Sequence, residues 1–111
     1  MTNLKNSVKL IGRLGKDPDV KTFDGGRKKA SFSLATTDSY KNQKGENQQD
    51  TQWHNLVIWG KLADVAGQYL KKGSEVAIEG RLVHRVYETK AGDKRYITEV
   101  NVSEMLLLGR K

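Results

Sequence analysis

Apolar residues occupy every second position in several stretches of the chain, which is the pattern of β-strands with one buried face. The first stretch runs over residues 8–14, and a later one, residues 51–59, is rich in aromatic and β-branched residues. Five strands are predicted in all. Two of the other three have apolar faces made of Ala30, Phe32 and Leu34 and of Val76, Ile78, Gly80 and Leu82, and the last strand runs through Tyr96, Thr98, Val100 and Val102.

The period changes between residues 61 and 72, where apolar side chains recur at helical spacing. This segment is predicted to form one helix of about three turns. Lys71 and Lys72 would then lie at the negative end of the helix dipole, and Gly73 would stop the helix. The predicted buried face of the helix consists of Leu62, Val65, Ala66, Tyr69 and Leu70.

Turn-forming residues separate these elements. Pro18 follows Asp17 after the first strand, and Gly25 and Gly26 follow Asp24, so a turn is predicted at both places. Residues 38–50 contain no aliphatic side chain, and we expect a solvated loop or the tip of a hairpin there. Connections of this length in compact domains often carry binding function.

The elements follow one another as β, β, β, α, β, β in a single domain that spans residues 1–111. Five strands with one helix between strands 3 and 4 describe the OB-fold, a small Greek-key barrel. The predicted fold class is therefore all-β. The open face and the loops of such barrels often bind oligonucleotides.

The charge of the chain points in the same direction. Its 111 residues include 20 Lys and Arg against 13 Asp and Glu, and the resulting net charge of +7 favours polyanionic partners, nucleic acid before acidic membranes. The N-terminal residues lack the apolar run of a signal peptide, and the longest apolar run, residues 105–108, is too short to cross a bilayer. We expect a cytoplasmic protein without a membrane partner.

The catalytic options are few. The absence of cysteine excludes disulfides, a thiol nucleophile and cysteine zinc sites, and two histidines cannot build a three-histidine metal centre. No complete phosphate loop, serine-hydrolase motif or zinc-protease motif is present, and the carboxylates are scattered. We therefore predict a protein that is not an enzyme and that has no cofactor.

The alternation along residues 51–59 separates a core face from an outward face. Leu56 and Ile58 make an apolar inner face, so Trp53 and Trp59 would point outward with Asn55 between them. The alternative is that both tryptophans belong to the core, because tryptophan is highly buried on average. The polar Asn55 argues against a dry interior on that side.

The next predicted strand carries Arg81, Arg85 and Tyr87 on its outward face, and Tyr40 stands near the start of the segment without aliphatic residues. An aromatic ring beside two arginines suits a groove for single-stranded nucleic acid, because bases stack on the ring and guanidinium groups contact phosphates. The alternative is an ordinary solvated barrel face. The predicted stacking residues are Tyr40, Trp53, Trp59 and Tyr87.

Lysines close to these aromatics are the candidates for phosphate contacts. Lys41, Lys44 and Lys61 lie nearest to them in sequence. Lys71 and Lys72 are included as well, although a pair of lysines at a helix end is often simply solvated.

Several segments match a known family in order along the chain. These segments resemble bacterial single-stranded DNA-binding proteins, and together they cover nearly the whole chain. They are Asn6-Ser-Val-Lys-Leu-Ile-Gly-Arg-Leu-Gly-Lys-Asp-Pro18, Phe32-Ser-Leu-Ala-Thr-Thr37, Thr51-Gln-Trp-His-Asn-Leu-Val-Ile-Trp-Gly-Lys-Leu-Ala63, Tyr69-Leu-Lys-Lys-Gly-Ser74, Ile78-Glu-Gly-Arg-Leu82 and Arg95-Tyr-Ile-Thr-Glu-Val100.

The resemblance implies an OB-fold homotetramer that wraps single-stranded DNA without sequence preference. Trp53 matches a stacking aromatic of the family directly. Tyr40 and Tyr87 stand where the best-known members carry tryptophan, and Trp59 stands where phenylalanine is usual. The matching basic positions are Lys61, Lys72 and Arg85.

The resemblance also bears on assembly. His54 matches a histidine linked in the family to tetramer formation, so we assign it, with Asn6, to the oligomer interface. The family usually continues into a flexible tail with an acidic tip that recruits repair enzymes, whereas this sequence ends at the basic residues 109–111. We expect a trimmed domain or a short plasmid, phage or mobile-element form, and recruitment through a tail is not carried over.

The sequence therefore predicts a non-catalytic protein that binds and protects single-stranded DNA in replication, recombination and repair. The nearest alternatives are an OB-fold accessory protein of primosome assembly and an RNA-binding OB module. A protein-interaction module with outward aromatics is a third possibility, and a nuclease is the most distant one.

Overall fold

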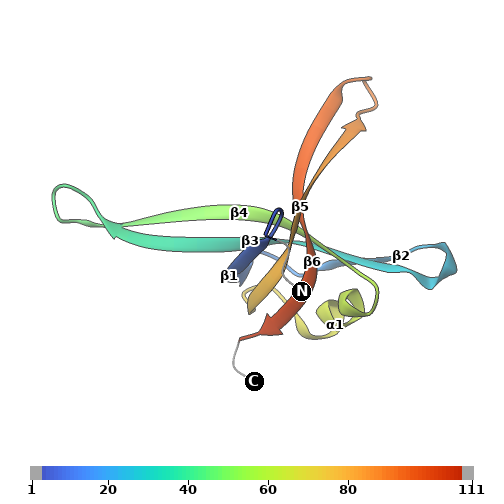
Figure 1. Ribbon diagram of the computed structural model, residues 1–111, viewed down its shortest axis with the longest axis horizontal. Helices are drawn as coiled ribbons and strands as arrows, with labels where there is room; N and C mark the ends of the chain where they lie inside the picture. Colours follow the sequence, from blue (N-terminus) through green and yellow to red (C-terminus); the bar gives the residue numbers. More distant parts are fainter. Residues whose placement is uncertain (1–3, 109–111) are drawn as a thin grey trace.

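The computed structural model describes residues 4–108, and strands dominate this part of the chain (Figure 1). The helix α1 and the short 3-10 helix η1 are the helical elements of these residues. In chain order the elements are β1 (Val8–Leu14), β2 (Asp19–Thr22), η1 (Asp24–Gly26), β3 (Lys28–Lys41), β4 (Asn47–Trp59), α1 (Lys61–Tyr69), β5 (Glu75–Glu88) and β6 (Lys94–Leu107).

Five of the strands close into a barrel. They are hydrogen-bonded in the order β1-β5-β6-β4-β3, and β1 pairs a second time with β3, where Arg13 lies opposite Ala35 and Leu14 opposite Leu34. The short β2 is appended to β3 outside this ring. The predicted all-β OB-fold is confirmed, with its helix between the third and fourth of the five barrel strands.

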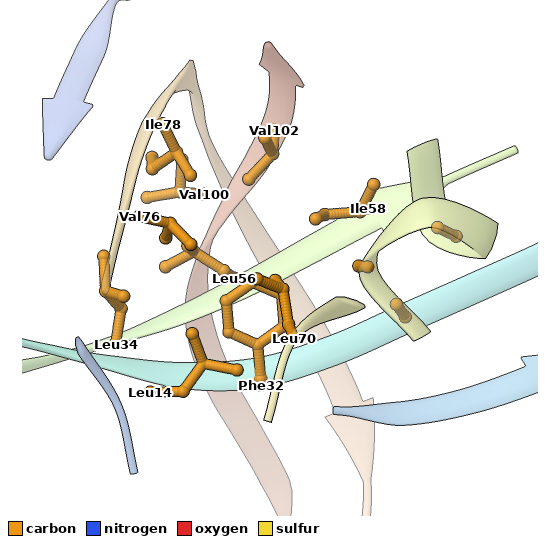
Figure 2. Close-up of a cluster of buried hydrophobic side chains, with 13 residues drawn as sticks. Leu14, Phe32, Leu34, Leu56, Ile58, Leu70, Val76, Ile78, Val100 and Val102 are labelled. Carbon is orange, nitrogen blue, oxygen red and sulfur yellow. The ribbon is translucent and has the colours of Figure 1, made fainter. Parts of the chain in front are cut away.

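The inward faces of the barrel strands and one side of α1 form a single apolar core (Figure 2). Leu56 and Ile58 are buried, as the alternation along β4 predicts. The other large side chains of this core are Leu14, Phe32, Leu34, Leu70, Val76, Ile78, Val100 and Val102.

The helix differs from its prediction in length and in buried face. It ends at Tyr69, and the extended backbone of Leu70 stops it before Lys71 and Lys72, so neither lysine caps the helix dipole. Its buried residues are Ala63 and the predicted Ala66, and the predicted Leu62 and Leu70 pack against or within the core, whereas Tyr69 is 64% exposed. The small alanine side chains let the helix lie close to the barrel, which turns the larger Tyr69 toward solvent.

Residues 38–50 form the end of a hairpin, the second of the two structures that the sequence allows. β3 and β4 remain paired as far as Lys41 opposite Asn47, and only residues 42–46 form the turn. The side-chain oxygen of Asn42 accepts hydrogen bonds from the backbone N–H groups of Lys44 and Glu46 at 2.9 Å, which closes the turn. The missing aliphatic residues reflect a two-stranded ribbon that covers no core.

Both long hairpins extend beyond the barrel, in different directions (Figure 1). The radius of gyration of 16.1 Å accordingly exceeds the about 13 Å of a compact domain of about 100 residues. Leu82 of β5 is exposed rather than part of the core, because β1 accompanies β5 only as far as Gly80. The barrel therefore supplies the stability, and the hairpins supply exposed surface.

Closure of the barrel depends on the absence of a side chain at Gly12. A Cβ atom at this position would lie 2.2 Å from the carbonyl oxygen of Ala35, far inside van der Waals contact. We expect Gly12→Ala to lower the free energy of unfolding by ~1–3 kcal/mol or more, because β1 or β3 would have to move. Chemical denaturation measures this change. Lys9→Ala, at an exposed position of the same strand, is the control, and equal stability of the two variants would contradict the prediction.

Candidate nucleic-acid interface

The outward faces of β3, β4, β5 and β6 form one continuous sheet surface. Along β4 this surface carries Trp53, Asn55, Val57 and Trp59, as the alternation predicts. In the register of the sheet, Ala35 lies opposite Trp53 and Lys29 opposite Trp59, while Asn101 of β6 lies beside Val57 and Arg81 of β5 beside Asn101. We call this surface the outer sheet face.

A groove of about 280 Å³ crosses the middle of the outer sheet face. Its walls carry cations, anions and uncharged polar groups side by side, so it is neither an apolar ligand pocket nor a uniformly basic channel. The side chains of this sheet groove include Lys16, Asp19, Lys29, Ser31, Ser33, Asn55, Val57, Arg85, Ile97 and Glu99.

Trp53 is the most exposed tryptophan of the chain. Its side chain is 61% exposed, and its ring covers Gly15, where a Cβ atom would lie only 2.5 Å from the indole Cζ3. The backbone N–H of Gly15 is held in turn by the carbonyl of Ser33 at 3.1 Å. One side of the indole is thus fixed by the turn after β1, and much of the ring remains accessible to a partner.

Trp59 lies at the other end of the same strand in a different environment. It is half-buried, with the ring of Phe23 at a centroid distance of 5.8 Å. The guanidinium carbon of Arg27 lies 4.5 Å from its ring centroid, and Lys29 Nζ lies 5.5 Å from it. Trp59 therefore points outward as predicted, but it packs against neighbouring residues instead of standing free.

The two candidate tyrosines are both exposed, but the structure does not place all four aromatics on one face. Tyr87 follows Arg85 on the outer side of β5, the side of the sheet groove. Tyr40 lies opposite Gln48, whose side chain is on the same face of β4 as that of His54. Tyr40 is therefore on the opposite side of the β3–β4 ribbon from Trp53, and not on the face of the sheet that carries this tryptophan.

Arg85 forms a bidentate ion pair within the sheet groove. Its Nε and one terminal nitrogen each donate a hydrogen bond of 2.9 Å to the carboxylate of Glu99. These hydrogen bonds lower the pKa of Glu99 against a smaller opposing effect of burial, and the positive charges of Arg85 and Lys29 lower it further. The pKa of Arg85 is raised by the same hydrogen bonds and charge. The sequence-predicted phosphate ligand is thus engaged with a carboxylate.

The predicted lysines are distributed over three places. Lys41 and Lys44 lie at the exposed end of the β3–β4 hairpin. Lys61 begins α1 and shares a small depression with Arg27. Lys71 and Lys72 line a separate depression, not the sheet groove, and the backbone N–H of Lys72 donates to Asp17 Oδ1 at 2.8 Å.

The two residues assigned to an oligomer interface are held by contacts within the chain. His54 is half-buried, with Nε2 3.0 Å from the hydroxyl of Thr36. The amide of Asn6 donates to the carbonyl of Leu82 at 3.0 Å and accepts from its N–H at 2.8 Å, which extends the pairing of β1 with β5 by one side chain. Their role in assembly stays a prediction.

Three residues that contact Trp59 were missed by the sequence reasoning, namely Phe23, Arg27 and Lys29. They come together only because β3 brings Lys29 opposite Trp59 and the β2–β3 turn folds back over the indole. Lys28 and Lys29 are adjacent in the sequence, but nothing in the sequence showed which of these two lysines would face Trp59.

Metal and membrane features were searched within the same residues. Across residues 4–108, no group of three or more His, Asp or Glu side chains converges as metal ligands would. No helix in this range is both long and apolar enough to cross a membrane.

Known proteins are similar to this chain over most of its length. A model of the single-strand binding protein family matches residues 5–108. A protein of Chlorobaculum tepidum named single-stranded DNA-binding protein 1 is 48% identical over 96% of this chain, and one of the same name from Xylella fastidiosa is 43% identical over 96%. The chain spans 66% of the length of the first relative and 79% of the second.

A solved structure is similar over almost the whole domain. It is a Plasmodium falciparum SSB in complex with ssDNA, with a TM-score of 0.85 and 34% sequence identity. The similarity covers 94% of this chain and 95% of that one.

The Arg85–Glu99 pair makes stability depend on pH in a defined direction. Because the folded state holds the pKa of Glu99 below its unfolded value, the pair stabilises the fold above about pH 4.3 and loses this effect as the pH falls through the lowered pKa. Glu99→Gln should cost about 1 kcal/mol or less at pH 7, since Arg85 is partly solvated, and the difference from wild type should shrink as the pH falls below about 4.3. Urea denaturation across this range measures it.

The matched control is Glu88→Gln, which removes an exposed carboxylate at the end of β5. A stability difference between Glu99→Gln and wild type that is the same at every pH would show that the ion pair does not contribute.

Proposed function

The chain belongs to the single-strand binding protein family, and we propose that it binds single-stranded DNA without catalysis and largely without sequence preference. Trp53 is the observation that carries this proposal. A large aromatic ring that is 61% exposed, fixed on one side and set beside a groove with Lys16, Lys29 and Arg85 is suited to stacking a base while cations contact its phosphates.

The binding mechanism combines two contributions. Bases stack on Trp53 and on Tyr87, and every base has a π-face, so stacking tolerates any sequence. Phosphates contact Lys41 and Lys44 at the hairpin end and Arg81 on β5, with release of counterions that makes affinity depend on salt. Arg85 contributes after a phosphate replaces the carboxylate of Glu99 as its partner.

Protection of exposed single strands in replication, recombination and repair follows from such binding. A strand that lies along the outer sheet face has its bases covered and its phosphates neutralised, which keeps it from re-pairing. Neither step needs a cofactor or a reactive group.

We propose in addition that the protein forms a homo-oligomer, a tetramer by family resemblance. The outward side of the β1–β5–β6 sheet supports this proposal. Ile11 lies opposite Ala77, and Ala77 opposite Leu106, so a short apolar row crosses three strands, with Ile11 60% and Leu106 63% exposed. Exposed apolar residues gathered in this way favour a contact with a second copy of the chain.

The stacking role of Trp53 is tested by titration with oligo-dT. We expect tryptophan fluorescence to be quenched in the wild type and affinity to fall linearly with the logarithm of salt concentration. Trp53→Ala should weaken binding by ~1–3 kcal/mol with little change in the melting temperature, because the ring is exposed.

Tyr96→Ala is the matched control, since Tyr96 is an exposed aromatic residue that lies on the other side of the β5–β6 hairpin from Tyr87. Affinity that is insensitive to Trp53→Ala, or stronger binding to duplex DNA or to RNA of the same length, would contradict the proposed function.

The assembly state is tested by analytical ultracentrifugation at micromolar concentration. We expect a species of about four times the 12.5 kDa chain mass, and Ile11→Glu should shift it toward smaller species by placing a charge in the apolar row. Val86→Glu introduces the same charge at an equally exposed apolar position of the β5–β6 hairpin and should leave the assembly intact. A wild-type monomer would remove both the oligomer and the role of His54 in it.

A further inference from the structure

A carboxylate lies in the middle of the surface that is proposed to bind a polyanion. Glu99 of β6 stands opposite Val83, so it is a diagonal neighbour of Arg85 on the same face of the β5–β6 hairpin. Its side chain is 11% exposed, whereas that of Arg85 is 47% exposed. A largely buried negative charge repels phosphates, so Glu99 opposes the binding that the cations of the sheet groove favour.

The ion pair occupies the edge of the guanidinium that suits a phosphate. Nε and one terminal nitrogen of Arg85 both donate to the carboxylate of Glu99, each at 2.9 Å. Two parallel N–H groups on one edge are the geometry with which arginine binds a carboxylate or a phosphate through two oxygens. Only one such anion can use this edge at a time. The carboxylate of Glu99 and a DNA phosphate therefore compete for the same donors.

The other charges of the sheet groove make an exchange of partners feasible. Lys16, Lys29 and Arg85 bring three positive charges to its walls, and Asp19 and Glu99 bring two negative ones. The charge of Lys29 acts on Glu99 together with that of Arg85, and both lower the pKa of this carboxyl. When a phosphate takes Arg85, Glu99 still has Lys29 as a neighbouring cation. The exchange therefore leaves no buried charge without compensation, which would be costly.

From this geometry we propose that Glu99 is an internal competitor of DNA phosphate for Arg85, which weakens binding and speeds release of the strand. The proposal rests on the proposed binding of single-stranded DNA and adds a limit on its strength. A phosphate that enters the groove displaces the carboxylate, and the carboxylate returns to Arg85 when the phosphate leaves. A protein that protects any single strand also has to give it up, and a built-in anion makes that release faster.

Removal of the carboxylate provides the first test. Glu99→Gln keeps the shape of the side chain and removes its charge, and we expect the affinity for an oligo-dT of about 16 nucleotides to rise about two- to fivefold in about 0.1 M salt. The plot of log affinity against log salt should become steeper by up to ~0.7, because Arg85 then starts without an ionic partner. Fluorescence anisotropy measures both quantities, and melting curves establish that the variant is folded.

Binding kinetics separate competition from a general effect of net charge. Loss of a hydrogen-bonded competitor acts on the rate of release, whereas a change of surface charge acts mainly on the rate of association. We therefore expect Glu99→Gln to slow dissociation, measured by stopped-flow chase with unlabelled oligo-dT. Glu88→Gln is the matched control, because it changes the net charge equally at an exposed position on the other side of the hairpin. It should dissociate at the rate of the wild type.

The pH dependence of affinity is a readout that a purely structural role would not change. Loss of Arg85 to a phosphate raises the pKa of Glu99 in the complex above its value in the free protein, so the complex binds more protons. The affinity of the wild type should then approach that of Glu99→Gln as the pH falls toward about 4.3. Of the other groups that line the groove, Asp19 titrates in both proteins, and Lys16 and Lys29 stay charged.

The outcomes separate the competitor role from the function on which it rests. If Glu99 instead stays paired and orients Arg85 for a phosphate, Glu99→Gln should weaken binding, and this result would overturn the competitor role alone. An unchanged affinity, the same gain in Glu88→Gln, or a ratio of affinities that does not vary with pH would overturn it as well. Failure of the wild type to bind any single strand would overturn the proposed function together with it.

Discussion

The second pairing of β1 is the constraint on which the rest of the structure depends. A strand that pairs with β5 along most of its length and then with β3 at Arg13 and Leu14 converts an open sheet into a closed barrel. The two backbones can meet there because Gly12 has no side chain to separate it from Ala35. Closure removes the free edges of the sheet and creates the interior that Leu34, Leu56 and the other core residues fill.

The closed barrel also determines where binding residues can stand. A small barrel has no room for a ligand inside, so chemistry is confined to its outer surface and to the segments that leave it. The turn after β1 brings Gly15 under Trp53, and the β2–β3 turn brings Arg27 over Trp59, so each tryptophan is oriented by a neighbouring turn. Rigid elements thus position aromatic rings that would otherwise sample many rotamers.

Local sequence patterns predicted the strands, and the buried faces of strands, wherever apolar and polar residues simply alternate. They failed where a contact between distant parts of the chain determines which side chain is buried. The parity of β4 correctly placed Leu56 inside and Trp53 outside, because a strand packed on one face has no other register. The predicted buried face of α1 was right for Ala66 and wrong for Tyr69, since the exact face depends on how closely Ala63 and Ala66 let the helix approach the barrel. The residues that contact Trp59 are determined by the register of β3 with β4 and by the fold of the β2–β3 turn. No local sequence pattern predicts either of these.

The two protruding hairpins divide the molecule into regions of unequal local stability. Residues such as Tyr40 and Tyr96 are fixed by ladder hydrogen bonds alone, without a packed layer behind them, and an isolated two-stranded ribbon is only marginally stable in water. Their backbone amides should therefore exchange with solvent deuterium through local opening, long before those of the barrel strands do so. A partner that lies along these ribbons would order them as it binds, so part of its binding enthalpy would be offset by lost chain entropy.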